Sequence, residues 1–367
     1  MATQLLNAKR GNITDEMQFV ADIEEIDVEI LRENIAQGTS VILKNNTRTT
    51  TNPTGIGEGL KIKIAASVGT TTKKATLDKE LDKVRVIEQA GADVLFDFST
   101  GNLIDETRQA ILSSTKLPLG VNPLLQIAIN QNKNKKGIFE LSKDEVLSAI
   151  EKICIDGVDF LALDCASTKA MFEQLKTQKR KTGIVTQSGL ILADFIHHTQ
   201  KENPIYEYFD EILEIIKPYD MTVLISNTFK TGCMADSGDK ISVIEAVMQG
   251  ETADKARNYG IQVMIENIGH IKPNEIENEI KLIKKLTKNA PLYTKTMTAE
   301  NTIGFDNINS AISSAISGIY GTNMINCTPS YENASCMTST QAKESIVCAR
   351  ISANCADLAN NNIKAKR

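Results

Sequence analysis

The 367-residue sequence contains no tryptophan, and aromatic residues make up only 5% of it. So few aromatic side chains leave little material for stacking nucleic-acid bases. Basic residues are also in deficit, because 41 Lys and Arg face 46 Asp and Glu for a formal charge of −5. A nucleic-acid or anionic membrane surface would need a basic patch. We therefore expect no nucleic-acid partner and no membrane partner.

Long hydrophobic runs are missing as well. No stretch approaches the roughly 18 apolar residues of a spanning helix. The N-terminal residues MATQLLNAKRGNITDEMQF have neither the apolar core nor the small-residue cleavage site of a secretory signal. The expected compartment is the cytoplasm.

Closely spaced cysteine pairs are absent too. The seven cysteines are an odd number without a CxxC pair, which argues against a disulfide framework. An iron–sulfur or zinc site usually has tight spacings that a short loop can wrap around the metal. Cys348 and Cys355 are seven apart on a predicted helix and so share one face, which we expect to be buried. Buried, reduced thiols are the preferred interpretation for these seven: Cys154, Cys165, Cys233, Cys327, Cys336, Cys348 and Cys355.

What the sequence does contain, from about residue 60, is a recurring pattern of short β-rich runs separated by helical segments. The runs are mostly apolar, as in parallel strands covered on both faces. Helical segments such as 79–91 and 143–157 end in glycine. The eight predicted strands are LKIKIAAS, DVLFDFS, LPLGVN, DFLALDCA, GIVTQ, MTVLIS, IQVMIE and PLYTKT. Because no GxGxxG follows the first strand, an α/β fold of the (β/α)8 barrel type is favoured over an open doubly wound sheet.

Three segments are predicted along the chain. Residues 1–58 form an N-terminal extension packed on the barrel, and their closing run, NNTRTTTNPTGIGEG, is interpreted as a loop. Residues 59–330 form the barrel. Residues 331–367 form a Ser/Thr/Asn-rich loop and one helix, KESIVCARISANCADLANN.

Polar residues follow most of the predicted strands, and in a barrel of this type strand C-termini form the functional face. Each one alone is more simply a capping or loop residue, so their concentration on one face is the stronger signal. The candidates are Ser67, Asp97, Ser99, Thr100, Asn122, Asp164, Cys165, Gln187, Asn227, Lys230, Glu266, His270 and Thr296.

Glu266 and His270 place a carboxylate and an imidazole at one strand end, which suits a metal site or acid–base chemistry. The competing interpretation is a polar strand-end cap, since metal sites normally collect three or four protein ligands. The other two histidines, His197 and His198, are expected on a helix away from this face.

Two loops have the composition of phosphate-binding loops. Residues 96–108, FDFSTGNLIDETR, bring small hydroxyls and a glycine to a predicted helix N-terminus, where free backbone N–H groups attract anions. An ordinary helix N-cap would account for the same residues equally well. Residues 225–237, ISNTFKTGCMADS, likewise contain small hydroxyl residues and a glycine, and they add Lys230 as a cation. Together they make a phosphorylated small molecule the expected ligand.

These residues fall into an ordered set of motifs: TQLLNAKRGNITDEMQFVA, ADVLFDFSTGNLIDETR, KTGIVTQSG, KENPIYEYFDEILEIIKPYD, GIQVMIENIGH, APLYT, IGFDNINSAISSAISGIYGTNMINCTP and CADLA. The set spans residues 3–360 and resembles the phosphomethylpyrimidine synthase family, with its 5-hydroxybenzimidazole synthase relatives. The resemblance implies a (β/α)8 lyase of the radical S-adenosylmethionine type that rearranges aminoimidazole ribonucleotide. It further implies S-adenosylmethionine, a [4Fe–4S] cluster and a divalent metal such as Zn or Fe as cofactors.

The resemblance also implies roles for individual residues. Glu266 and Asp97 stand at catalytic positions, and His270 matches a metal-binding histidine. Asn307 stands where the family has its second metal histidine. Implied substrate contacts are Ser99, Thr100, Gly101, Asp164, Gln187, Ser188, Gly189, Asn227, Lys230 and Glu266.

The sequence departs from the family pattern at several strand ends. Gln187 and Lys230 replace arginines, Asn227 replaces an aspartate, and Asp164 replaces a histidine. Lysine cannot grip phosphate bidentately as arginine does, and asparagine is a poorer ligand than imidazole for a transition metal. Phe305 replaces a tyrosine, and Ala65 and Ser67 replace asparagines.

The family's closing CxxCxxxxC loop, which holds the cluster, is not found before Arg367. Three explanations stay open at this stage: a divergent enzyme that has lost its C-terminus, a cluster supplied by a partner subunit, or a non-catalytic paralogue that binds a ligand or acts as a scaffold. The expected assembly is a homodimer, or a heterodimer with a cluster-bearing paralogue.

Overall fold

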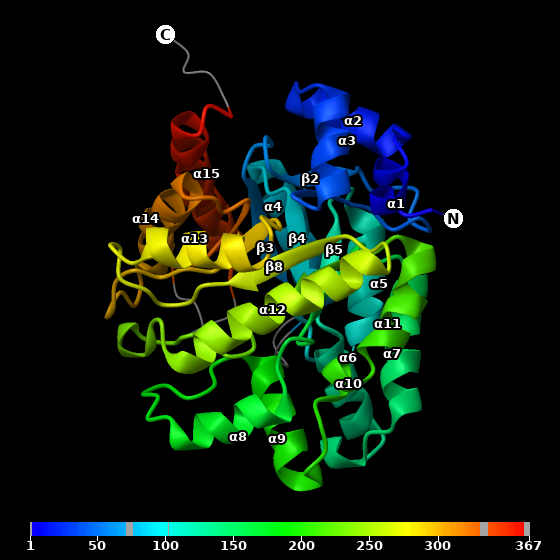
Figure 1. Ribbon diagram of the computed structural model, residues 1–367, viewed down its shortest axis with the longest axis vertical. Helices are drawn as coiled ribbons and strands as arrows, with labels where there is room; N and C mark the ends of the chain where they lie inside the picture. Colours follow the sequence, from blue (N-terminus) through cyan, green and yellow to red (C-terminus); the bar gives the residue numbers. More distant parts are fainter. Residues whose placement is uncertain (1, 71–75, 102, 331–336, 363–367) are drawn as a thin grey trace.

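A closed ring of eight parallel strands lies at the centre of the computed structural model, which describes residues 2–70, 76–101, 103–330 and 337–362 (Figure 1). The strands follow one another around the ring in chain order, and the last strand pairs with the first. The predicted (β/α)8 architecture is therefore confirmed. The strands are β3 (Lys63–Val68), β4 (Val94–Asp97), β5 (Leu119–Val121), β6 (Phe160–Leu163), β7 (Thr222–Ile225), β8 (Val263–Asn267), β9 (Leu292–Thr294) and β10 (Met324–Asn326).

One of the eight predicted strands was wrong. Residues 183–187, which the structure describes in full, lie in a loop that enters a helix, because the Thr186 hydroxyl accepts the Gly189 N–H and caps that helix at 3.3 Å. The strand that completes the ring is β10 instead. Only two of its residues, Met324 and Ile325, are apolar, and asparagines flank them on both sides, so no apolar run stands out in the sequence.

Helices connect the strands and form the outer layer, with their ends where the sequence signals them. The Ser142 hydroxyl and the Glu145 side chain form a capping box at the start of α7, and Gly157 ends this helix in the left-handed region with φ 94°. The main helices of the ring are α4 (Leu77–Ala90), α5 (Ile104–Ser114), α6 (Pro123–Lys133), α7 (Lys143–Asp156), α8 (Lys169–Thr177), α9 (Gln187–Thr199), α11 (Phe209–Ile216), α12 (Lys240–Asn258), α13 (Ile276–Leu286), α14 (Asp306–Ile319) and α15 (Ser339–Ala359).

The interior of the ring is filled by large side chains. The Phe96 ring meets the Phe160 ring edge-on at 5.0 Å and stacks on Tyr293 at 5.3 Å between centroids. Gly120 of β5 lies against the Phe160 ring, which a Cβ at this position would strike. The ring is therefore a packed core, and chemistry has room only at its mouth.

The N-terminal segment closes the opposite end of the barrel. Helices α1 (Gln4–Lys9), α2 (Asp15–Glu24) and α3 (Val28–Gln37) lead into an antiparallel pair, β1 (Ser40–Leu43) and β2 (Thr54–Gly57). The prediction of one continuous loop over residues 45–59 was thus wrong, because its second half pairs with β1 as β2. Val41, Leu43 and Ile56 of this pair belong to the same apolar cluster as Phe96 and Phe160.

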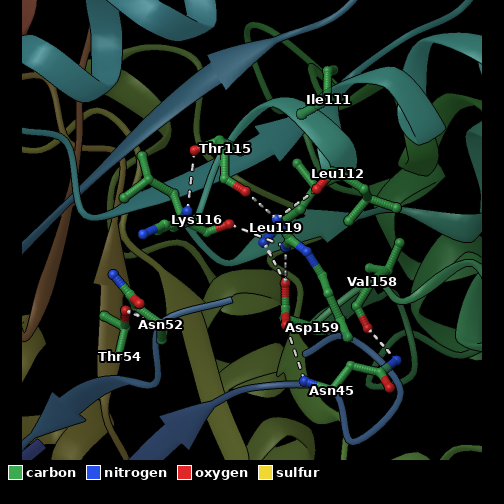
Figure 2. Close-up of polar contacts among 12 residues, drawn as sticks. Asn45, Asn52, Thr54, Ile111, Leu112, Thr115, Lys116, Leu119, Val158 and Asp159 are labelled. Atoms are coloured by element: carbon green, nitrogen blue, oxygen red, sulfur yellow. Dashed lines mark hydrogen bonds and ion pairs between the residues drawn. The ribbon is translucent and has the colours of Figure 1, made fainter. Parts of the chain in front are cut away.

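A buried ion pair fastens this hairpin to the strand starts (Figure 2). Asp159, directly before β6, accepts Arg48 Nη1 at 2.7 Å, the Asn45 N–H at 3.0 Å and the Leu119 N–H at 2.9 Å. Arg48 also donates to the carbonyls of Leu112 and Thr115. Both carboxylate oxygens of Asp159 and both terminal nitrogens of Arg48 thus have partners, which offsets the cost of burying the two charges.

The C-terminal helix α15 takes the eighth outer position. It packs against α14 and α4, and Figure 1 shows it beside α14 on one flank of the barrel. Its Asp357 accepts the Ile62 N–H at 3.1 Å, immediately before β3. The division of the chain into segments at residues 58 and 330 remains a prediction. Among the helices of the described ranges, none is long and apolar enough to cross a membrane.

Candidate active site at the barrel mouth

The closed parallel ring brings the C-terminal ends of all eight strands to one face. Asp97 is the last residue of β4, Asp164 follows β6, and Glu266 lies near the end of β8. Asn227 and Lys230 follow β7, and His270 follows β8. The predicted gathering of these strand-end positions at one mouth is therefore what the topology produces.

Asp164 is the centre of a hydrogen-bond network at this mouth. Its buried carboxylate accepts Asn122 Nδ2 at 2.9 Å, Ser188 Oγ at 3.0 Å and Thr228 Oγ1 at 2.8 Å. Burial raises the pKa of Asp164, and these three donors oppose the rise by stabilising the carboxylate. One side chain thus ties together the loops after β5, β6 and β7 and the start of α9.

The segment 187–189 joins the site through α9 rather than through a strand. Ser188 reaches Asp164, as described above, and Gln187 is the first residue of the helix. Gly189 lies so close to the β7 loop that a Cβ would sit 2.9 Å from the Thr228 carbonyl oxygen. A glycine is therefore needed for α9 to approach this loop.

Helix α12 holds the loop after β7 in place. The fully buried carboxylate of Glu245 accepts the backbone N–H groups of Thr228 at 2.6 Å and Phe229 at 3.2 Å. Asn227 continues the network, because its Nδ2 donates to Asn267 at 3.3 Å and Asn267 donates to Gln249 at 2.7 Å. These contacts fix the backbone from which Lys230 projects.

Lys230, after β7, pairs with Glu266 of the neighbouring strand β8. Lys230 Nζ lies 2.9 Å from Glu266 Oε1, and the two side chains are 13% and 17% exposed. This pair is accessible from the mouth, unlike Asp164. An anionic group entering the site would meet the ammonium, and Glu266 would have to share or release it.

The loop after β4 is tightly organised by its neighbour after β3. Asp97 accepts the Ser99 N–H at 2.8 Å, and the Ser99 hydroxyl accepts the Thr70 N–H at 3.0 Å. The N–H groups of Thr100 and Gly101 both donate to the Thr70 carbonyl at 3.1 Å. These two amides are therefore occupied in this conformation, contrary to the expectation of free donors for a phosphate. Burial raises the pKa of Asp97.

His270 and Asn307, the two predicted metal ligands, lie in different surroundings. His270 lines a narrow pocket with Asn227, Asn267 and Thr231, and its backbone N–H donates to the Thr231 carbonyl at 3.0 Å. Asn307 on α14 instead places its Nδ2 3.7 Å from Cys348 Sγ of α15. In the part of the chain that is described, no group of three or more His, Cys, Asp or Glu side chains could hold a metal ion.

The cysteines that are described do not fit an iron–sulfur cluster, because they are dispersed over the fold. Cys154, Cys165 and Cys327 are buried, as predicted, and Cys233 is half-buried. Cys355 is exposed and Cys348 half-buried, so the prediction of a buried face for these two was wrong. They point toward α14 and solvent, while Ile346, Ala349 and Ala353 face the core. Cys336 lies outside the described residues.

A family model described as Radical SAM ThiC matches residues 3–367, and the chain belongs to this family. Membership implies S-adenosylmethionine and an iron–sulfur cluster as cofactors.

Curated relatives match nearly the whole chain. A Methanocaldococcus jannaschii protein named phosphomethylpyrimidine synthase is 37% identical, covering 98% of this chain and 84% of the relative. A Moorella thermoacetica protein named 5-hydroxybenzimidazole synthase BzaB is 38% identical, covering 99% of this chain and 85% of the relative.

Among solved structures, a Stenotrophomonas maltophilia dihydropteroate synthase shares 9% identity with a TM-score of 0.46, covering 84% of this chain and 96% of that chain. A likeness this distant carries no functional information.

Several residues of the site gave no recognisable sequence signal. Thr228 lies within the 225–237 loop but was not among its candidate residues, and Glu245 and Gln249 lie outside every motif, yet all three are central to the network. Glu245 and Gln249 are four apart on α12, a spacing that puts them on one helix face. Buried polar residues at that spacing on a helix following a strand end are the signal that could have identified them.

The carboxyl of Glu245 makes stability at this site depend on pH. Burial raises the pKa of Glu245 from 4.5 to about 8, and the charge of Asp164 adds to the rise. The folded protein then binds a proton that the unfolded chain releases. The contribution of this proton to the free energy of unfolding is full below pH 4.5 and is lost as pH rises through about 8.

The side chain of the Glu245→Gln variant cannot titrate. We expect the unfolding free energy of the wild type to fall relative to Glu245→Gln between about pH 5 and pH 9, by up to about 1.4 kcal/mol per pH unit. Urea titrations across that range measure it, and parallel pH profiles would contradict it.

Proposed function

We propose that this chain is a radical S-adenosylmethionine lyase, or the barrel subunit of one, that rearranges aminoimidazole ribonucleotide. Its product would be the thiamine pyrimidine or a benzimidazole destined to be a cobamide lower ligand. The observation that carries the proposal is membership of the Radical SAM ThiC family over residues 3–367, with relatives at 37% and 38% identity named for these two syntheses. Both relatives are named as synthases, so nothing here favours the non-catalytic alternative.

The described residues supply binding and orientation, while the radical chemistry would belong to the cofactors. Asp164, Asn122 and Ser188 form a rigid polar wall, since each is held by another member of the network. Lys230 is the cation proposed for the substrate phosphate. Glu266 and Asp97 are the proposed acid–base groups, and burial favours the protonated form of Asp97. Ser99, Thr100, Gly101, Gln187, Gly189 and Asn227 remain proposed contacts.

Turnover tests the proposal directly. The chain, reconstituted anaerobically with iron and sulfide, alone and mixed with a cluster-bearing paralogue, is expected to release 5′-deoxyadenosine from S-adenosylmethionine when aminoimidazole ribonucleotide is present. Chromatography of the nucleoside products measures this. The proposal fails if neither mixture cleaves S-adenosylmethionine while circular dichroism shows an intact fold.

Substrate recognition gives a second, independent test. Lys230→Met removes the proposed phosphate contact, and a hydrogen bond to a charged group contributes about 1.5–3 kcal/mol, or roughly 10- to 150-fold in affinity. Calorimetry should therefore show that much weaker binding of aminoimidazole ribonucleotide. Lys288→Met, on a side chain that is 67% exposed and paired with Asp254, is the matched control and should bind normally.

The dephosphorylated riboside separates phosphate recognition from a general disturbance of the mouth. It should bind Lys230→Met and wild type alike. An equal loss of riboside and ribonucleotide affinity would show that Lys230 shapes the pocket without contacting phosphate.

His270 is the proposed ligand of a divalent metal, although the described residues around it do not form a cluster of three His, Cys, Asp or Glu side chains. The imidazole would have to share the ion with substrate or water. Metal analysis after loading with Zn²⁺ or Fe²⁺ should show about one bound ion fewer in His270→Ala than in wild type. His198→Ala, on an exposed helical histidine, is the control. Equal metal content in all three proteins would remove His270 from the site.

A further inference from the structure

One buried amide joins the ends of the two neighbouring strands from which Lys230 and Glu266 project. The amide belongs to Gln249 of α12, a helix that packs against both β7 and β8 (Figure 1). Gln249 has no exposed surface. Glutamine is mostly found at protein surfaces, and a buried one needs hydrogen-bond partners for its polar atoms.

The side chain of Gln249 finds these partners on both strands. Its Nε2 donates to the Ser226 carbonyl at 3.1 Å, directly after β7, and to the Glu266 carbonyl at 2.8 Å, within β8. Its Oε1 accepts Asn267 Nδ2 at 2.7 Å. Both donor positions and the acceptor of the amide are therefore used.

These bonds begin where the backbone pairing of the two strands stops. The last partners in the β7–β8 register are Ile225 and Ile265. Ser226 and Glu266 come next, and the amide of Gln249 bridges their carbonyl groups. Gln249 thus links the strands at the point from which both chains lead into the mouth.

The same contacts reach the backbone just beyond Glu266. Asn267 Oδ1 accepts the Ile268 N–H at 2.6 Å, and Ile268 has a φ of 69°. This left-handed conformation is strained for a β-branched residue, so the surrounding structure has to impose it. Because Gln249 holds the Asn267 side chain, the turn that leads away from Glu266 is tied to α12 as well.

We propose that Gln249 is a positioning residue that holds Lys230 and Glu266 at pairing distance. One helical turn earlier on the same face of α12, Glu245 accepts the N–H groups of the two residues before Lys230. Helix α12 therefore fixes the backbone on both sides of the pair. The ammonium and carboxylate atoms lie 2.9 Å apart, and a displacement of about 1 Å at either strand end would break that contact.

The use of this pair by a ligand rests on the proposed function, whereas its dependence on Gln249 does not. A purely structural role for the amide is the alternative, and it predicts lost stability without any specific effect on Lys230 and Glu266. The two roles are separated by measuring the pair itself.

Gln262 is a matched control at the opposite end of β8, which it directly precedes. It is also buried, and it makes three comparable bonds. Its Nε2 donates to the Ile42 carbonyl at 2.9 Å and to Thr222 Oγ1 at 3.3 Å, and its Oε1 accepts the Ile42 N–H at 2.8 Å. Gln249→Met and Gln262→Met each leave such groups unpaired, so both should lower stability. Only Gln249→Met should disturb the mouth.

A double-mutant cycle on stability tests the proposal without any ligand. Urea unfolding gives the coupling between Lys230→Met and Glu266→Gln in the wild type, in Gln249→Met and in Gln262→Met. We expect a coupling of roughly 2- to 10-fold in the unfolding equilibrium constant for the wild type and for Gln262→Met. In Gln249→Met the coupling should be absent.

Three results overturn the proposal: coupling that persists in Gln249→Met, coupling that is lost equally in Gln262→Met, or a wild type without coupling, which has no pair to hold. If Gln249→Met does not fold, Gln249→Asn takes its place in the cycle, because its amide is one methylene too short to bridge both carbonyls.

Calorimetry with aminoimidazole ribonucleotide then connects the pair to the proposed function. Gln249→Met should bind this ligand about 10- to 100-fold more weakly than the wild type, and Gln262→Met should bind it normally. A wild type that does not bind the ribonucleotide contradicts the proposed function and leaves the result of the cycle unchanged. Normal binding by Gln249→Met contradicts the positioning role.

Discussion

The parallel pairing of β10 with β3 is the constraint on which the site depends. It closes the ring, and closure makes all eight strands end on one face. An open sheet built from the same strands would place the residues after β4 and those after β8 far apart. Because the strand interiors are packed with Phe96, Phe160 and Tyr293, the polar groups can gather only where the strands end.

The two ends of the barrel manage buried charge in different ways. At the closed end, Asp159 and Arg48 pair with each other and bind backbone groups, which holds the N-terminal hairpin in place. At the mouth, Asp164 is buried among neutral donors, and Glu245 holds backbone amides. The Lys230–Glu266 pair is partly exposed and can therefore exchange partners when a ligand enters.

The departures from the family pattern take on a physical meaning in this arrangement. Asp164, where the family usually has a histidine, is accommodated by three hydrogen-bond donors from three loops. Lys230, in place of an arginine, is joined by a single ion pair to Glu266. Both side chains therefore have hydrogen-bond partners in the surrounding network.

The sequence by itself determined the fold class, seven of the eight ring strands, and the helix ends marked by Ser142, Gly91 and Gly157, because apolar periodicity and capping are local properties. It also determined the family, and the polar positions at the strand ends. Only the tertiary structure decided that Met324–Asn326 completes the ring and that residues 54–57 form a strand of the hairpin, since short strands are defined by their partners. Tertiary packing likewise placed Glu245 and Thr228 in the network and Asn307 beside Cys348. Such contacts join residues 17 to 64 positions apart, and no local pattern encodes which distant group a side chain will meet.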